Sequence, residues 1–251
     1  MIRGLYISAA GMSSQMKNHE VISNNLANVD TAGFKKDEMV FESFREFLLS
    51  RVDDPTDIGG NPVIGSVSLG VLPDDIVTDY SVGVPQETGR NLDLAIQGED
   101  GFFVVETPQG ARYTRAGNFH QTAGGAVVTS DGYPVLGDTG PIQIGQSDFV
   151  VSQAGDVIVD GEIVNRILVV AVPEDALVKE GDSLFRAQED AAAVPLLDAT
   201  VYQGFLESSN VNAVEEMIDM ISGLRLYEAN QRSLSVQDET LAQLLNESLR
   251  G

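Results

Sequence analysis

The C-terminal part of the chain has apolar residues that recur alternately four and three residues apart. This seam consists of Ala213, Met217, Met220, Leu224, Tyr227, Gln231, Leu234, Asp238, Leu241, Leu245 and Ser248. Such spacing is typical of a helix that packs lengthwise against another helix. Asn212 and Glu215 provide a capping signal at its start. The pattern predicts a helix over residues 211–249.

The N-terminal residues repeat the same four-three spacing and predict a first helix over residues 1–28. Its seam consists of Leu5, Ala9, Met12, Met16, His19, Ser23 and Leu26. We expect the two terminal helices to pair as a coiled-coil-like stalk. The polar Gln231 and Asp238 are unlike a dry core and favour a seam that selects its partners and register. The alternative is a long surface helix lying on a globular body.

A turn is expected directly after the first helix. Asn28, Asp30 and Thr31 are turn formers, and Gly33 is free to adopt positive φ. We predict positive φ at Gly33 and burial of Phe34.

The next residues show a second amphipathic pattern and then a loop. The apolar positions between Asp37 and Ser50, with Val40 and Phe44 on one side, predict a second helix. Residues 52–65 are rich in Gly, Pro and Asp and are interpreted as a loop or linker.

The central residues change from helical to alternating periodicity. Short runs rich in β-branched residues occur at 67–71, 92–96, 102–106, 127–129, 142–144, 149–151, 157–159 and 167–172. Turn formers separate them, which predicts an all-β body of antiparallel hairpins. Pro173–Asp182 is interpreted as an acidic loop with one helical turn. The predicted fold class is α+β, with a terminal helical stalk (1–35 and 206–251), an amphipathic piece and linker (36–65) and a β-rich body (66–205).

Composition excludes several classes of protein. The net charge is −23 among 251 residues, so nucleic-acid binding through phosphate contacts is not expected. Cysteine is absent, which rules out disulfides, thiol catalysis and cysteine metal sites. No apolar run is long enough for a membrane helix, and the N-terminus lacks the pattern of a cleaved secretory signal.

Catalytic chemistry finds little support in the residues. His19 lies on the N-terminal seam and His120 in a strand-like run, and neither belongs to a nucleophile or metal motif. The aspartates of the central region lack the spacing of a calcium loop and are interpreted as turn residues. We therefore expect no enzyme, cofactor or metal. Two alternatives remain open: a β-rich binding or adhesion protein, and a hydrolase that uses Asp93 with Glu99 or Glu106 as an acidic pair.

Four stretches, in order, resemble the bacterial flagellar rod and hook protein family. They are Ser23–Lys35 (SNNLANVDTAGFK), Asn91–Val105 (NLDLAIQG and then GFFVV), Tyr113–Phe119 (YTRAGNF) and Gly204–Ile218 (GFLESSNVN and then EEMI). The resemblance covers most of the chain.

This resemblance implies a structural subunit of the basal-body rod, proximal or distal, that assembles helically into the drive shaft between motor and hook. A hook-type axial subunit is the alternative. The implied partners are copies of this chain, other axial proteins and the flagellar export apparatus, which would export the chain to the periplasmic rod without a cleaved signal. The residues expected to serve assembly are Leu5, Met12, Met16, Leu26, Asn28, Gly33, Phe34, Met217, Met220, Leu224, Tyr227, Leu234, Leu241 and Leu245.

Overall fold

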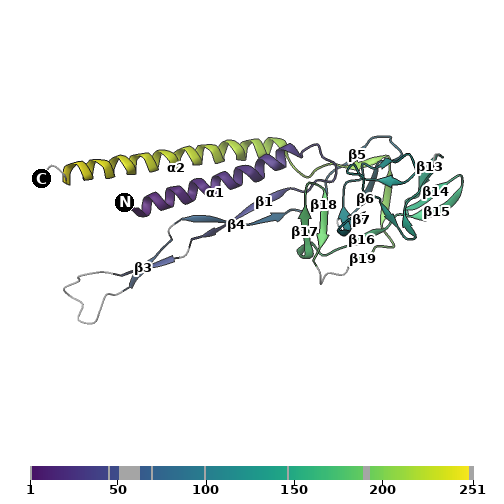
Figure 1. Cartoon of the computed structure of the whole chain (residues 1–251), viewed down its shortest axis with the longest axis horizontal. Coiled ribbons are helices and arrows are strands. Elements are labelled where there is room, and N and C mark those ends of the chain that lie inside the picture. Colours follow the sequence, from purple (N-terminus) through teal and green to yellow (C-terminus); the bar gives the residue numbers. More distant parts are fainter. Residues whose placement is uncertain are drawn as a thin grey trace. The chain divides into compact units, whose positions relative to one another are not determined.

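The computed structural model describes residues 2–44, 46–50, 63–68, 70–98, 100–145, 147–188 and 193–248. The fold is α+β, with a long helix near each end of the chain and many β-strands between them (Figure 1). Contacts divide the chain into two units. The first contains Met1–Asn24, Asp37–Val77 and Val214–Gly251, and the second contains Asn25–Lys36 and Thr78–Ala213.

The two terminal helices are α1 (Ile2–Ala27) and α2 (Ala213–Ser248). Within the first unit they lie side by side and run antiparallel (Figure 1). The Ser8 hydroxyl donates a hydrogen bond of 3.3 Å to the Ser233 hydroxyl. Both helices are therefore confirmed where the apolar spacing predicts them.

The predicted second helix between Asp37 and Ser50 is wrong. This stretch forms β1 (Asp37–Ser43) and β2 (Glu46–Ser50), which pair with β4 (Val71–Thr78) and β3 (Val63–Ser68). The ladders join residues far apart in sequence, and cross-strand pairing with a Val-rich partner overrides the local helical spacing. The loop predicted over residues 52–65 is also corrected at its end, because Val63 begins strand β3. Residues 52–62 of that loop lie outside the residues that the structure describes.

The second unit contains antiparallel strands, as predicted. They are β5 (Pro85–Glu87), β6 (Leu94–Gln97), β7 (Gly101–Thr107), β8 (Gly110–Thr114), β9 (His120–Gln121), β10 (Val127–Val128), β11 (Leu136–Gly137), β12 (Gly140–Pro141), β13 (Phe149–Val151), β14 (Asp156–Val159), β15 (Glu162–Arg166), β16 (Val169–Ala171), β17 (Leu177–Glu180), β18 (Leu184–Ala187), β19 (Val194–Pro195), β20 (Thr200–Gln203) and β21 (Phe205–Glu207). The largest sheet has the strand order β17-β18-β8-β7-β16-β19. We call residues 78–213 the body.

Two sequence predictions within the body need correction. Residues 142–144 are not a strand, although Ile142 and Ile144 are buried. The expected helical turn occurs as a 3-10 helix at Glu174–Ala176, but Leu177–Glu180 of the predicted loop forms β17. Leu177–Glu180 pairs in register with Leu184–Ala187, so its backbone groups are satisfied by a hairpin that the acidic composition concealed.

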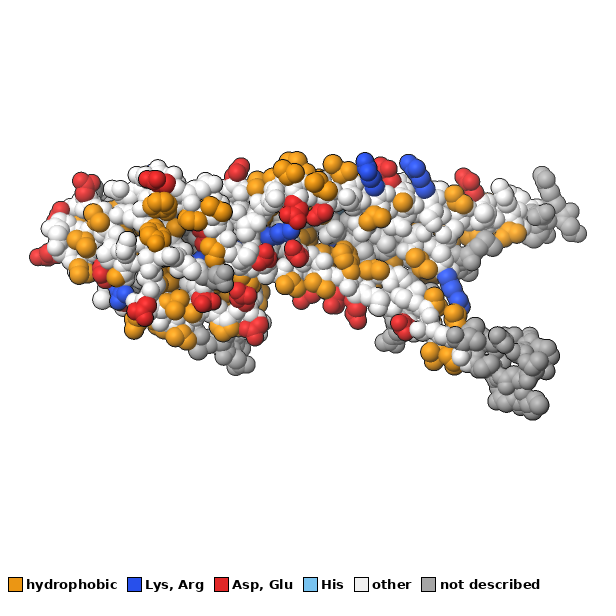
Figure 2. Space-filling model, turned by 180° about the vertical axis from the view of Figure 1, so that it is seen from behind, with side chains coloured by type: hydrophobic (Ala, Val, Ile, Leu, Met, Phe, Trp, Pro, Cys, Tyr) orange, Lys and Arg blue, Asp and Glu red, His pale blue; other side chains and the backbone are white. Residues whose placement is uncertain are grey.

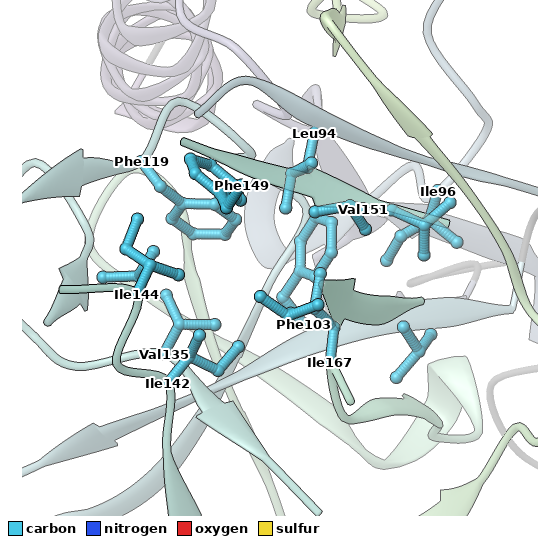
Figure 3. Close-up of a cluster of buried hydrophobic side chains, with 14 of the residues drawn as sticks. Leu94, Ile96, Phe103, Phe119, Val135, Ile142, Ile144, Phe149, Val151 and Ile167 are labelled. Carbon is cyan, nitrogen blue, oxygen red and sulfur yellow. The ribbon is translucent and has the colours of Figure 1, made fainter. Parts of the chain in front are cut away.

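Strand β7 explains how the body acquires two clusters of buried side chains. Alternate side chains of a strand point to opposite faces of the sheet. Phe103 and Val105 enter a cluster that includes Phe119 and Ile167 (Figure 3). Phe102 and Val104, one position earlier, enter a second cluster that includes Tyr80 and Phe185. The continuous apolar run of β7 therefore fills both faces of the largest sheet.

Candidate assembly surface and buried junction

Helix α2 faces α1 with a stripe of alternating large and small or polar side chains. Its buried or half-buried positions are Ala213, Glu216, Met220, Gly223, Tyr227, Asn230, Leu234, Gln237 and Leu241. They alternate by three and four residues, as a helix–helix seam requires. The seam expected from sequence shares five of these positions and lies one residue away at the others.

Small residues of α1 explain the shift of the seam. A Cβ atom added to Gly4 would collide with the Gln237 side chain, and one added to Gly11 would lie 2.8 Å from Asn230 Nδ2. Because Gly4 and Gly11 have no Cβ atoms, the polar side chains of Gln237 and Asn230 fit directly over the backbone of α1 at these two positions. Met217 and Leu224, which the apolar pattern favours, lie outside this contact.

A second face of α2 carries large apolar side chains that the chain itself leaves exposed. Val214, Met217, Ile218, Ile221 and Leu224 have between 44% and 67% of their surface exposed. Figure 2 shows hydrophobic side chains on the surface of the N-terminal part of α2. We call these five residues the exposed stripe. It extends over about three helical turns, since its members are three or four residues apart.

The other residues expected to serve assembly differ in exposure. Half-buried positions are Leu5, Met12, Leu26, Asn28, Met220, Tyr227, Leu234 and Leu241. Met16 and Leu245 are exposed, whereas Gly33 is buried and Phe34 is fully buried. Of the two predictions for the turn after α1, positive φ at Gly33 is confirmed at 67° and burial of Phe34 is confirmed at 0% exposure.

The second unit contains a buried junction of charged residues from three distant segments. Lys35, Arg115 and Glu207 are each no more than 2% exposed. The Lys35 ammonium donates 2.7 Å hydrogen bonds to Glu207 Oε1 and to the Ser81 carbonyl. The Arg115 guanidinium contacts Glu207 Oε2 at 3.3 Å and donates to the Gly98 carbonyl at 2.9 Å. Glu207 thus joins two buried cations.

Electrostatics at this junction are dominated by burial. Loss of solvation lowers the pKa of Lys35, and the neighbouring Glu207 carboxylate opposes this change. The Glu207 carboxylate also accepts the Gly83 N–H at 3.1 Å, so the acidic side chain has donors from several directions. Removing one member of such a buried network lowers the free energy of unfolding strongly, because it leaves the remaining charge buried without its partner.

Sequence reasoning missed these three charged residues. Lys, Arg and Glu are rarely fully buried unless they are paired, so a single sequence offers no reason to choose them. A signal was nevertheless available, because each lies within one of the stretches that carry the family resemblance: Lys35 after Gly33-Phe34, Arg115 after Tyr113-Thr114, and Glu207 after Phe205-Leu206.

The acidic-pair hypothesis gains no geometric support. Asp93 is buried and accepts a 2.7 Å hydrogen bond from the Thr88 hydroxyl, while Glu106 is exposed on β7. Glu99 lies outside the described residues. Among the described residues, no group of three or more His, Asp or Glu side chains could hold a metal ion, and no helix is long and apolar enough to cross a membrane.

Comparison with known proteins decides the family. The chain matches the flagella basal body rod protein model at residues 5–35, the flagellar hook protein FlgE/F/G D1 domain at 95–159, and the flagellar basal body rod FlgEFG protein C-terminal domain at 202–247. The flagellar basal-body rod protein FlgG of Bacillus subtilis is 34% identical over 266 aligned positions, which cover 98% of this chain and 99% of that protein. This chain belongs to the flagellar basal-body rod protein family.

Other rod proteins match over a similar length. FlgG of Agrobacterium fabrum is 32% identical and covers 99% of this chain and 100% of its own length. FlgF of Caulobacter vibrioides is 34% identical and covers 91% of each chain. The rod-family matches at 5–35 and 202–247 contain most of α1 and α2, and the hook D1 match lies in the body.

Proposed function

We propose that this protein is a structural subunit of the flagellar basal-body rod, and that it assembles with copies of itself and with other axial proteins. The observation that carries the proposal is near-full-length similarity to proteins named as basal-body rod proteins. The resemblance of four separate stretches in the correct order supports it.

The helix pair supplies a physical basis for assembly. Small or polar residues alternate with large ones at the contact between α1 and α2, while the exposed stripe leaves further large apolar side chains in water. Contiguous exposed apolar patches on a soluble protein mark sites of interaction. We propose that α1 and α2 form a coiled-coil-like stalk and that the exposed stripe packs against helices of neighbouring subunits.

The cellular location follows from the same proposal. The subunit would leave through the flagellar export apparatus without cleavage of a signal, and would occupy the periplasmic part of the basal body. The net charge of −23 supports protein partners rather than nucleic acid. Mass spectrometry of the N-terminus of assembled protein tests the export route, since an intact N-terminus is expected.

Electron cryomicroscopy of purified basal bodies tests the function directly. A tagged subunit should lie in the rod, and deletion of its gene should abolish rod formation and swimming, with both restored by the unmodified chain. A subunit found in the hook would support the hook-type alternative instead. Normal rods without the protein would contradict the proposal.

A further inference from the structure

The two hydrophobic clusters of the second unit are built without residues 33–35. Every member of the two buried clusters lies between Tyr80 and Val201. Phe34 is fully buried, yet it belongs to neither cluster. The segment 25–36 is also separated in sequence from the body by the whole of β1 to β4. A segment distant in sequence from the body therefore contacts it without contributing to its hydrophobic clusters.

The body holds this segment by backbone and side-chain contacts. The Gly33 N–H donates to the Glu207 carbonyl at 2.8 Å. Lys179 donates a 2.7 Å hydrogen bond to the Lys35 carbonyl, and its ammonium lies 3.9 Å from the centre of the Phe34 ring. A cation in this position is attracted by the face of an aromatic ring. Three successive residues are thus each recognised in a different way.

Close approach of the backbones accounts for the glycine. Gly33 has a φ of 67°, and a Cβ atom there would collide with the backbone of Arg115 and Ala116. A β-branched residue at position 33 would collide with the backbone of Arg115 and Ala116, and it would also have to adopt an unfavourable positive φ. The site consequently selects glycine before the aromatic residue.

Charge accounts for the lysine. Arg115 and Glu207 both belong to the body and contact each other at 3.3 Å, so the body supplies a buried carboxylate with one cation already in place. Lys35 brings a second cation to the other carboxylate oxygen and reaches the Ser81 carbonyl. The body therefore presents acceptors for an incoming ammonium group.

We propose that the body carries a recognition site for a Gly-Phe-Lys segment, and that Gly33–Lys35 fills it as a separable plug. The plug fastens the segment that follows α1 to the body, and it opens without unfolding the body's cores. A Gly-Phe-Lys segment from a second copy of the chain has the same chemistry and fits the same site. The covalent connection raises the effective concentration of the chain's own plug, so the site is normally filled in cis.

A peptide added in trans tests this proposal on the full chain. In a Gly33→Val variant the chain's own plug is excluded, so a fluorescently labelled peptide of residues 28–37 should bind saturably, as measured by fluorescence anisotropy. The parent chain should bind the same peptide at least tenfold more weakly. A peptide that itself carries Phe34→Ala should not bind the variant. A folded variant that fails to bind the peptide, or a variant whose body no longer unfolds cooperatively, would overturn the proposal.

Hydrogen exchange in the parent chain gives an independent measurement. The Gly33 amide is bonded to the Glu207 carbonyl, and the Val135 amide is bonded to the Val127 carbonyl within a buried cluster. A separable plug predicts that the Gly33 amide exchanges at least tenfold faster than the Val135 amide, through local opening. Equal free energies of opening at the two amides would show that the segment is an integral part of the body.

Discussion

The body and helix α2 differ in what they do with their largest apolar side chains. In the body, large apolar residues such as Phe103, Phe119 and Phe185 are completely buried. In the helix pair, glycine and polar residues alternate with large side chains such as Leu234 at the contact, while Ile218 and Ile221 remain more than half exposed. The aromatic core of the body is therefore complete within one chain, whereas the exposed stripe of α2 is left for other molecules.

This difference separates stability from assembly. Burial of apolar surface stabilises a fold by roughly 25 cal/mol per Å². The body gains that term as a monomer, and α2 gains it at the exposed stripe only when a partner covers the stripe. Substitutions in the body should therefore change the unfolding of the monomer, and substitutions in the stripe should change assembly.

The largest effect on the monomer is expected in the body core. Phe103 is fully buried, and its ring lies 5.2 Å from that of Phe119, centre to centre. Phe103→Ala should lower the free energy of unfolding of the body by about 4 kcal/mol, because it leaves a cavity. Urea unfolding followed by circular dichroism measures this change. Val150→Ala, at an exposed position of β13, is the control, and an equal loss in both variants would contradict the assignment of the core.

A somewhat smaller effect is expected at the buried junction. Glu207→Gln removes the carboxylate shared by Lys35 and Arg115 and should cost about 3 kcal/mol. Lys35→Met should cost less, since Arg115 and Glu207 still pair. Urea unfolding of the two variants under identical conditions makes the comparison. A larger loss for Lys35→Met would show that Glu207 is not the centre of the network.

The contact between the helices should respond more weakly. Leu234 is half-buried in the seam and Ser235 is exposed beside it. Leu234→Asp should destabilise the helix pair by about 1–2 kcal/mol, and Ser235→Asp should change it by less than about 0.5 kcal/mol. Hydrogen exchange of α2 amides measures both. The body should retain its stability in each variant, and its unfolding together with the helices would contradict their independence.

The smallest effect is a pH dependence at the junction. Burial lowers the pKa of Lys35 in the folded state, so the unfolded chain binds this proton more tightly. The contribution of Lys35 to stability should therefore rise with pH, between the lowered folded pKa and the unfolded value of about 10.4. Subtracting the free energy of unfolding of Lys35→Met at each pH isolates this contribution. A difference that falls with rising pH would mean that the ion pair, rather than burial, dominates.

Sequence patterns predicted those features that depend on neighbouring residues. The helices, the all-β body and the turn at Gly33 all follow from spacing and local backbone preferences. The prediction of a second helix at Asp37–Ser50 was wrong, because Val40 and Phe44 fit a helical stripe, whereas the pairing of β1 and β2 depends on residues 63–78. Four of the nine positions of the α2 seam were displaced by one residue, because the choice of face depends on Gly4 and Gly11 of the other helix. The charged junction depends on three distant segments and leaves no periodic trace.

The most direct test of the difference between body and helices compares two adjacent substitutions on α2. Ile221 lies in the exposed stripe, and Ser222 is exposed one position further along the helix. Ile221→Asp and Ser222→Asp should leave the urea unfolding of the purified monomer within about 0.5 kcal/mol of the parent, since both positions are exposed. Rods counted by electron microscopy should be lost for Ile221→Asp and normal for Ser222→Asp. Normal rods with Ile221→Asp would contradict the assignment of the exposed stripe to assembly.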